Sequence, residues 1–232
     1  MQKLAIITAR GGSKRIPNKN IKDFRGKPII AYSIEAAIQS RLFDEVMVST
    51  DSRQIAEIAE QYGANIPFFR SEKTSNDFAT TADVLNEVLT EYERLGREYG
   101  VICCIYPTAP FVTADKLKQG YELLVSSGAD EVIPVIRFSF PPQRGYIIRD
   151  GKLAWQYPEY KNTRSQDLEP IYQECGQFYF YRTEKFRNKT IETMVPMIMR
   201  EEETQDIDQP SDWKMAELKY MLAHGSIDAD EE

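Results

Sequence analysis

Basic residues are concentrated near the N-terminus of a chain that is acidic as a whole. The 232 residues carry a net charge of −7, yet residues 10–27 carry a charge of +6, because seven Lys or Arg residues surround one acid, Asp23. The pair Gly11–Gly12 lies among them, and glycine lets backbone amides come close to a ligand. Positive charge beside two glycines indicates a site for an anion such as a polyphosphate. The seven basic residues are Arg10, Lys14, Arg15, Lys19, Lys22, Arg25 and Lys27.

The glycine pair belongs to neither of the two common phosphate-binding patterns. No GxxxxGK[ST] segment is present, and residues 15–18 supply no third glycine for GxGxxG. Arg10, Lys14 and Lys19 have a spacing that could neutralise a polyphosphate. The alternative is a plain glycine turn followed by solvated lysines, and the pattern alone leaves both open.

A second candidate site is the acidic pair Asp206 and Asp208 in "QDID". Side chains two apart in an extended segment point the same way, and two carboxylates on one face suit Mg²⁺. The alternative is a helix cap, because Asp208 directly precedes a helix expected from Pro210 to about His224. Asp212 is a weaker third candidate ligand.

Composition excludes several functional classes. His224 is the only histidine, which makes Ser-His and Cys-His mechanisms and a histidine-rich metal site improbable. The three cysteines form no CxxC pair and resemble reduced core thiols, which suits the cytoplasm. We expect no membrane helix and no signal peptide. We also expect no nucleic-acid partner, because no broad basic face is implied. The cysteines are Cys103, Cys104 and Cys175.

Short apolar runs alternate with segments of helical periodicity over the first 140 residues. This alternation predicts an α/β fold with a largely parallel sheet, in which ligands bind beyond the carboxyl ends of the strands. Expected strands cover residues 3–9, 44–50, 101–107, 130–138, 176–182 and 194–200, and expected helices cover residues 26–40, 51–64, 81–96 and 113–128. Expected helix caps are Asp51 or Ser52, Thr80 or Thr81, and Thr113, with Gly63 and Gly128 as stops.

The alternation breaks near Phe138. The segment 139–160 predicts a hairpin with "RDGK" as its turn, and residues 138–175 are expected to form a lobe that projects from a single domain, residues 1–225, and contacts a partner subunit. The tail 226–232 holds four acids and is expected to be solvated and frayed.

The segment "ARGGSKRIPNKNI" closely resembles the N-terminal motif of the acylneuraminate cytidylyltransferase family. The similarity continues in order through "LFDEVMVSTD", "RSEKTSNDFATTADVL", "YPTAPF", "NTRSQDLEPIYQECGQFY" and "QDIDQPSDW", and so spans nearly the whole chain. Family members make a cytidine monophosphate sugar from CTP and a nonulosonic acid. The resemblance implies a three-layer α/β/α, Rossmann-like nucleotide-diphospho-sugar transferase fold and a homodimer. Several stretches look most similar to the members that act on pseudaminic acid.

The resemblance also implies roles for individual residues. The triphosphate of CTP would contact Arg10, Gly11, Gly12, Ser13, Lys14 and Lys19. The nucleoside would contact Asn20 and Arg70, and the cytosine would lie beside Ala79 and Thr81. The sugar would contact Tyr106, Arg164, Gln166, Gln177, Phe178 and Tyr179. Asp206 and Asp208 would bind Mg²⁺, and with Arg10 and Lys19 they would be the catalytic residues. Arg164 can pair with the sugar carboxylate through two parallel hydrogen bonds. Tyr106 occupies a position where sialic acid enzymes typically carry Gln.

The implied reaction is attack of the anomeric hydroxyl of the sugar on the α-phosphorus of CTP, with release of pyrophosphate. The base that removes the proton of the sugar hydroxyl is not identified: a carboxylate and a hydroxide on the metal both remain candidates. Three alternatives remain: an enzyme for sialic or legionaminic acid, a sugar-1-phosphate nucleotidyltransferase, and a non-catalytic nucleotide-binding protein on the same fold. The segment "RSEKTSNDFATTAD" could instead be a loop that only caps a helix, and "GQFYFYR" could be a plain core strand without a role in binding.

Overall fold

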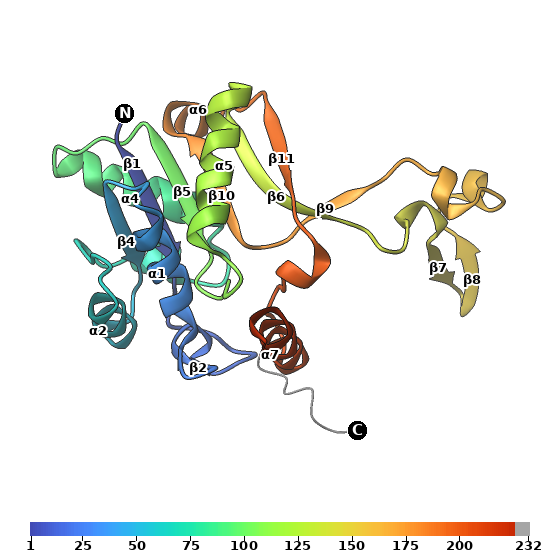
Figure 1. Cartoon of the computed structure of the whole chain (residues 1–232), viewed down its shortest axis with the longest axis horizontal. Coiled ribbons are helices and arrows are strands. Elements are labelled where there is room, and N and C mark those ends of the chain that lie inside the picture. Colours follow the sequence, from blue (N-terminus) through green and yellow to red (C-terminus); the bar gives the residue numbers. More distant parts are fainter. Residues whose placement is uncertain (226–232) are drawn as a thin grey trace.

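A seven-stranded, mostly parallel sheet forms the centre of the protein. The computed structural model describes residues 1–225 (Figure 1). Along the sheet the order is β11-β6-β10-β5-β1-β4, and β9 pairs with the last residues of β6. The pairs β1–β4, β1–β5 and β6–β11 are parallel, whereas β10 runs antiparallel to β5 and β6. The strands are β1 (Lys3–Thr8), β4 (Glu45–Ser49), β5 (Val101–Ile105), β6 (Glu131–Arg137), β9 (Tyr172–Glu174), β10 (Phe178–Arg182) and β11 (Met194–Ile198).

The central strands are buried on both faces, which explains why they are continuous apolar runs rather than alternating ones. Toward the β4 edge of the sheet, Ile6 of β1 is paired with Met47 of β4 and with Cys104 of β5, and all three residues are fully buried. One face is covered by α1 (Ile29–Ser40), α2 (Arg53–Gln61) and α5 (Ala114–Ser127), and the other by α4 (Thr81–Arg94) and α6 (Thr183–Asn188). The prediction of three α/β/α layers is therefore confirmed.

Most of the expected helix ends are found. Ser52, rather than Asp51, caps α2 by accepting a hydrogen bond from the Ile55 amide. Thr80, rather than Thr81, caps α4 in a capping box with Asp83. Thr113 caps α5, which ends at Gly128 with φ of 71°. A one-turn helix, α3 (Glu72–Ser75), precedes α4.

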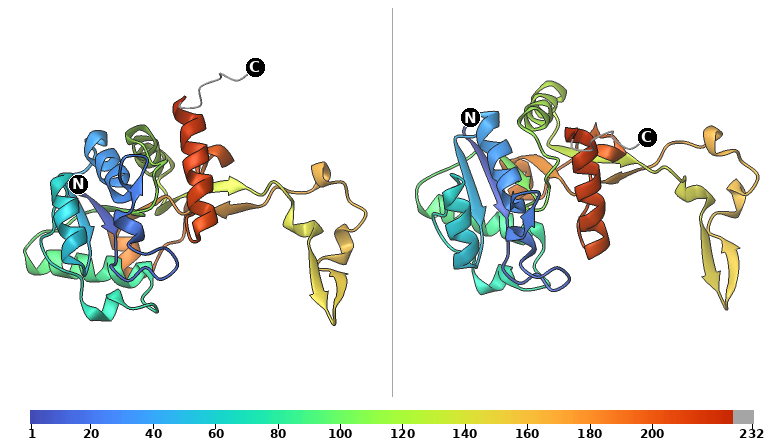
Figure 2. Two further views of the ribbon diagram at one scale, coloured as in Figure 1. Left: turned by 90° about the horizontal axis from the view of Figure 1, so that it is seen from below. Right: turned by 60° about the horizontal axis from the view of Figure 1, so that its bottom comes forward.

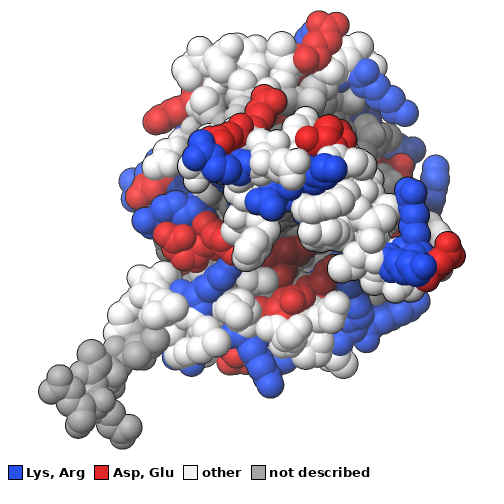
Figure 3. Space-filling model, turned by 90° about the vertical axis from the view of Figure 1, so that its right-hand side faces the viewer, with Lys and Arg blue, Asp and Glu red and all other residues white. Residues whose placement is uncertain are grey.

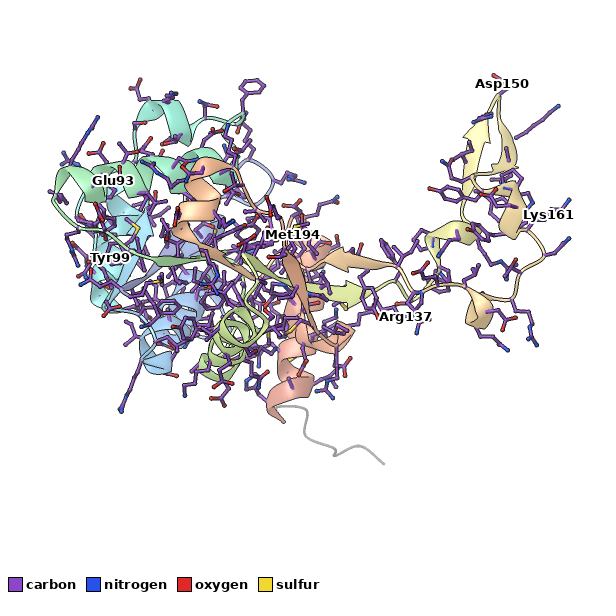
Figure 4. All side chains as sticks on the ribbon, turned by 90° about the horizontal axis from the view of Figure 1, so that it is seen from above. Glu93, Tyr99, Arg137, Asp150, Lys161 and Met194 are labelled. Carbon is purple, nitrogen blue, oxygen red and sulfur yellow. The ribbon has the colours of Figure 1, made fainter. Side chains whose placement is uncertain are left out.

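Between β6 and β9 the chain leaves the body of the molecule as an extended lobe. It holds a hairpin of β7 (Tyr146–Arg149) and β8 (Lys152–Trp155), where Asp150 and Gly151 have φ of 50° and 72°. Two successive residues of positive φ are typical of the type I′ turn that "DG" favours. Figure 4 shows Arg137 where the lobe leaves the body and Asp150 at its tip. The expected range of 138–175 was too long, because β9 pairs with β6 in the central sheet.

Several short elements complete the described chain. The small strands β2 (Asp23–Phe24) and β3 (Lys27–Pro28) precede α1, and the last helix, α7 (Pro210–His224), packs on them through Trp213. Within the described residues, no helix has both the length and the apolar composition needed to span a bilayer. The predicted frayed tail, 226–232, lies outside the described residues. The 3₁₀ turns are η1 (Lys19–Ile21), η2 (Pro142–Arg144), η3 (Pro158–Tyr160), η4 (Ser165–Asp167) and η5 (Glu201–Glu203).

Candidate functional site

A cleft of about 530 Å³ opens at the carboxyl ends of β1, β4 and β5, where ligands bind in open α/β sheets. Five basic and three acidic side chains line it, so the cleft has an excess of positive charge. Eleven residues predicted from the sequence lie in its wall: Arg10, Ser13, Lys14, Lys19, Asn20, Arg70, Ala79, Thr81, Tyr106, Asp206 and Asp208. Other lining residues include Thr8, Arg15, Thr74, Asn76, Asp77, Pro107 and Thr108.

The two glycines of the loop after β1 have different surroundings. A Cβ atom on Gly11 would lie 3.1 Å from Cβ of Ser52, and the Gly11 amide donates to Oδ1 of Asp51 at 2.8 Å. A Cβ atom on Gly12 would meet nothing within 4 Å. Position 11 is therefore tightly packed against the N-cap of α2 and favours glycine, whereas position 12 leaves space beside the backbone.

The basic residues of the loop form two ion-paired groups. Arg10 Nη1 contacts Oδ1 of Asp77 at 2.7 Å, and Lys14 pairs with the second oxygen of the same carboxylate. These two cations hold the pKa of Asp77 below its usual range. Arg15 and Lys19 instead lie 3.2 Å and 3.6 Å from the carboxylate of Asp208. No contact of Arg15 could be predicted locally, because its partner Asp208 lies almost 200 residues away in the chain.

Arg70 is a largely buried cation in the wall of the cleft. Its Nε donates to Ser49 Oγ at 3.0 Å and its Nη2 to the Ser49 carbonyl at 2.6 Å, at the end of β4. Burial lowers the pKa of Arg70 to about 10, so it stays charged at neutral pH. Asn20 supports the same region, because its Nδ2 donates to the carbonyl of Arg10 at 2.9 Å.

Two threonines at the start of α4 have different roles. Thr80 is the helix cap, so the hydroxyl of Thr81 is not needed for capping and lines the cleft, 3.5 Å from the hydroxyl of Tyr106. Ala79 lies beside them, in a turn where Oδ1 of Asn76 accepts the Ala79 amide. This corner presents a hydroxyl group and backbone atoms, which are suitable partners for the amine and acceptor atoms of a nucleobase.

Asp206 and Asp208 reach the cleft from the segment before α7. Ile207 between them is fully buried, and its carbonyl accepts a hydrogen bond from Lys19 Nζ at 2.6 Å. Burial and the nearby charge of Asp208 raise the pKa of Asp206. Asp208 is not the cap of α7, because Gln209 occupies that position. Asp212, the third candidate ligand, accepts the backbone amides of Asp208 and Gln209 at 3.0 and 2.7 Å and so serves the helix start.

The donor set of the acidic pair fits a hard cation. Carboxylate oxygens are the ligands that Mg²⁺ prefers, and Mg²⁺ usually takes one or two of them with phosphate oxygens and water. Burial and repulsion from Asp208 raise the pKa of Asp206, and a cation between the two side chains would relieve the repulsion. In the described chain, no group of three or more His, Cys, Asp or Glu side chains could hold a metal. Asp206 and Asp208 would therefore supply part of a coordination shell.

The expected sugar-binding residues are not all at the cleft. Tyr106 lines it, with Tyr179 behind at a ring-centroid separation of 5.6 Å, and Tyr179 donates to Glu174 at 3.2 Å. Phe178 is fully buried, and a Cβ atom on Gly120 of α5 would lie 2.9 Å from its ring. Phe178 is therefore a core residue and does not form part of the cleft wall. The reason is strand alternation, which sends Phe178 and Tyr179 to opposite faces of the sheet.

Three more of the expected residues lie away from the cleft wall. Gln177 is fully buried, and neither atom of its amide group has a hydrogen-bond partner among the described residues. Arg164 and Gln166 lie on the lobe, where Arg164 Nε donates to Asp167 at 2.8 Å. Neither residue lines the cleft of its own chain. The lobe that carries them projects away from the sheet (Figure 2), and Gln166 lies beside Phe138 and Ser139 near the base of the lobe.

Charge on the face from which the lobe projects is mixed. Figure 3 shows basic and acidic side chains interspersed there, without one continuous basic area. Four of the seven basic residues in 10–27 line the cleft, and two others have local partners. Lys27 pairs with Glu35, and Lys22 lies 4.5 Å from the centroid of the Trp213 ring.

The chain is similar to known proteins over nearly its full length. The model of the cytidylyltransferase family matches residues 4–219. A pseudaminic acid cytidylyltransferase of Campylobacter jejuni is 37% identical over 232 residues, covering 97% of this chain and 99% of that protein. A CMP-N,N'-diacetyllegionaminic acid synthase of Legionella pneumophila is 34% identical over 228 residues, covering 94% and 95%.

A solved structure of CMP:2-keto-3-deoxy-manno-octonic acid synthetase complexed with CTP shares the fold. Its TM-score is 0.69 at 17% identity, and the match covers 97% of this chain and 100% of that one. The expected nucleotide-sugar transferase fold is therefore confirmed. The match of the family model over residues 4–219, together with relatives above 30% identity over nearly the full length, shows that the chain belongs to the cytidylyltransferase family.

Proposed function

We propose that this protein transfers CMP from CTP to pseudaminic acid, forming CMP-pseudaminic acid, a donor for bacterial surface or flagellin glycosylation, and pyrophosphate. The observation that carries the proposal is a cleft with Arg10, Lys14 and Lys19 on one wall and the pair Asp206 and Asp208 beside them. The 37% identity to a pseudaminic acid cytidylyltransferase over 97% of the chain supports the choice of sugar.

The side chains would divide the work between binding and electrostatic stabilisation. Arg10, Lys14 and Lys19, with the amides of residues 11–13, would hold the triphosphate, because each can donate to phosphate oxygens. Arg70 and Asn20 would hold the nucleoside, and Ala79 and Thr81 the cytosine. These contacts would place the α-phosphorus in front of the sugar hydroxyl, and charge on the leaving pyrophosphate would be stabilised by fixed cations.

The acidic pair would hold Mg²⁺, which when bound neutralises charge on the triphosphate. Lys19 has a second function in this arrangement. Its hydrogen bond to the carbonyl of Ile207, at 2.6 Å, ties η1 to the backbone between the two acids. Lys19 would therefore orient Asp206 and Asp208 as well as contact the nucleotide.

A panel of sugars tests the proposal. Purified protein is incubated with CTP, Mg²⁺ and either pseudaminic, legionaminic or N-acetylneuraminic acid, and pyrophosphate release is measured. We expect the highest kcat/KM with pseudaminic acid. Higher activity with legionaminic acid would favour the second candidate function, which the 34% identity to a legionaminic acid synthase supports. Release no faster than the blank with all three acids would contradict the proposal.

We also propose that the protein is a homodimer in which the lobe of one subunit reaches the cleft of the other. Arg164 and Gln166 are carried by the lobe, away from their own cleft, and would contact the sugar in the partner's cleft. The lobe exposes large apolar side chains, including Phe140 at 88%, Ile148 at 75% and Leu153 at 70%, as expected of a surface that is covered in an assembly.

Mixing two inactive variants tests the exchange of lobes. Arg164→Ala removes the lobe contact and Asp208→Asn disables the cleft. In a mixed dimer the intact lobe of the Asp208→Asn chain would serve the intact cleft of the Arg164→Ala chain. About one quarter of wild-type activity should return, because half of the dimers are mixed and each has one complete site. No recovery after subunit exchange, or a monomer by light scattering, would contradict the proposal.

A further inference from the structure

Asp77 lies in the turn before α4 and contacts two cations of the loop that follows β1. Its Oδ1 accepts from Arg10 Nη1 at 2.7 Å, and its Oδ2 accepts from Lys14. The three residues join segments more than 60 positions apart. One carboxylate thus uses both oxygens to bind the two cations, which is the arrangement that a phosphate group would adopt with the same side chains.

The backbone that carries Asp77 is fixed without help from its carboxylate. Asn76 Oδ1 accepts the amides of Phe78 and Ala79 at 2.8 and 3.1 Å, and the capping box at Thr80 begins α4 immediately afterwards. The Asp77 side chain is half exposed, and its hydrogen bonds are those to Arg10 and Lys14. Rotation of this side chain can therefore release both cations while the turn and the helix start remain in place.

The cations have other support as well. Arg10 is held through its carbonyl, which accepts from Asn20 Nδ2 at 2.9 Å. The side chain of Lys14 is 78% exposed, so it is free to turn toward a ligand once the carboxylate has left. The contact with Asp77 is consequently not what places the backbone of Arg10 at the cleft.

We propose that Asp77 is an internal competitor for the triphosphate site, which occupies Arg10 and Lys14 until CTP displaces it and returns to them when pyrophosphate leaves. This inference rests on the proposed function, because it takes these two cations as triphosphate ligands. Two half-exposed ion pairs must be broken or shared before the nucleotide can use both cations, and the fixed negative charge repels the incoming phosphates. Asp77 lowers affinity for CTP and favours release of the product.

Asp77→Asn tests the proposal, since it removes the charge and keeps the shape. Binding of CTP with Mg²⁺, and of inorganic pyrophosphate, is measured by titration calorimetry on the full chain. We expect both ligands to bind about three- to tenfold more tightly than to wild type, which lies within the roughly two- to thirtyfold range that two surface ion pairs imply. In turnover, KM for CTP falls and inhibition by pyrophosphate strengthens, whereas kcat does not rise.

Two further variants separate competition from a general charge effect. Glu72→Gln removes one negative charge from α3, outside the cleft lining, and should change affinity less than twofold. In the Lys14→Gln background, Asp77→Asn should give a clearly smaller gain, because only Arg10 is then released. A gain of the same size in the Lys14→Gln background would contradict the mechanism.

The outcomes distinguish this inference from the proposed function. If wild type binds CTP and Asp77→Asn binds it equally well or more weakly, Asp77 is a positioning residue and the inference is wrong. If Asp77→Asn gains affinity for pyrophosphate but neither protein uses CTP, the competition stands and the proposed function is wrong. A wild type that binds neither ligand overturns both.

Discussion

Replacing Lys19 by methionine separates a catalytic role from a purely structural one. Methionine keeps much of the length and volume of the side chain and removes the charge and the donor. Lys19 Nζ donates to the Ile207 carbonyl at 2.6 Å and lies 3.6 Å from Oδ1 of Asp208. At 3.6 Å one pair of unit charges interacts by about 1 kcal/mol at a dielectric constant of 80 and about 5 kcal/mol at 20.

If negative charge develops at a similar distance from Lys19 during the reaction, the energy of its interaction with Lys19 lies between these two values. Loss of one fixed donor at such a site typically lowers kcat by about 10²–10³, or ~2.7–4 kcal/mol, and we expect a decrease of this size in Lys19→Met. Loss of a hydrogen bond from a charged group costs roughly 1.5–3 kcal/mol of stability. For a chain of this length that corresponds to a decrease in Tm of roughly 3–12 °C, which leaves the activity assay at 25 °C on folded protein.

Lys116 is a matched control for this change. It is also partly buried and also donates to two backbone carbonyls, those of Phe111 at 3.0 Å and Glu203 at 3.4 Å. It lies in a second cleft, of about 780 Å³, between α1, α5 and α7. Lys116→Met should lower Tm by a similar amount and leave pyrophosphate release close to wild type. A folded Lys19→Met with kcat within tenfold of wild type, or an equal loss in Lys116→Met, would refute the reasoning.

Three other outcomes are expected. Asp208→Asn should lower pyrophosphate release at least 100-fold (about 2.7 kcal/mol) without a large change in Tm, and activity within tenfold of wild type would contradict a role at the site. Burial raises the pKa of Cys104 and Cys175 to about 12, so these thiols should react with a disulfide reagent at pH 8 only after unfolding; rapid labelling of native protein would show that they are accessible. Hydrogen bonds from Thr80 hold the pKa of Asp83 below its usual value, so its contribution to stability is complete above about pH 4 and is lost as pH falls further. Asp83→Asn should therefore flatten the acid side of the stability curve, and an unchanged curve would argue against the capping role.

Those parts of the fold that depend on local chemistry could be predicted from the sequence. The apolar runs of β1 and β5, the caps Ser52 and Thr113 and the "DG" turn of the lobe each depend on neighbours within a few residues. The direction of β10 could not be predicted in this way. It runs antiparallel to β5 and β6 because the chain returns from the lobe along β6 before it enters the sheet.

The same distinction applies to the site. The positions of Arg10, Lys19 and the acidic pair at the cleft were predicted because each follows a strand or precedes a helix at the ligand-binding edge. Asp77 was missed, because its pairing with Arg10 joins residues 67 positions apart and neither residue carries a local signal for it. Phe178 was misplaced because alternation says that neighbouring residues face opposite ways but does not say which of them faces the core.

The two ends of the lobe are neighbours in the sheet. Arg137 of β6 is paired with Tyr172 of β9, and the amide of Phe138 donates to the carbonyl of Ile171 at 3.0 Å. Paired residues of antiparallel strands have Cα atoms only about 4.5–5.5 Å apart, so a tight turn could close the gap if residues 138–171 were removed. The lobe is in this sense a module inserted into an intact sheet. Substitutions, insertions or replacement of the whole segment can change what this end of the molecule recognises without altering the strand order that forms the cleft.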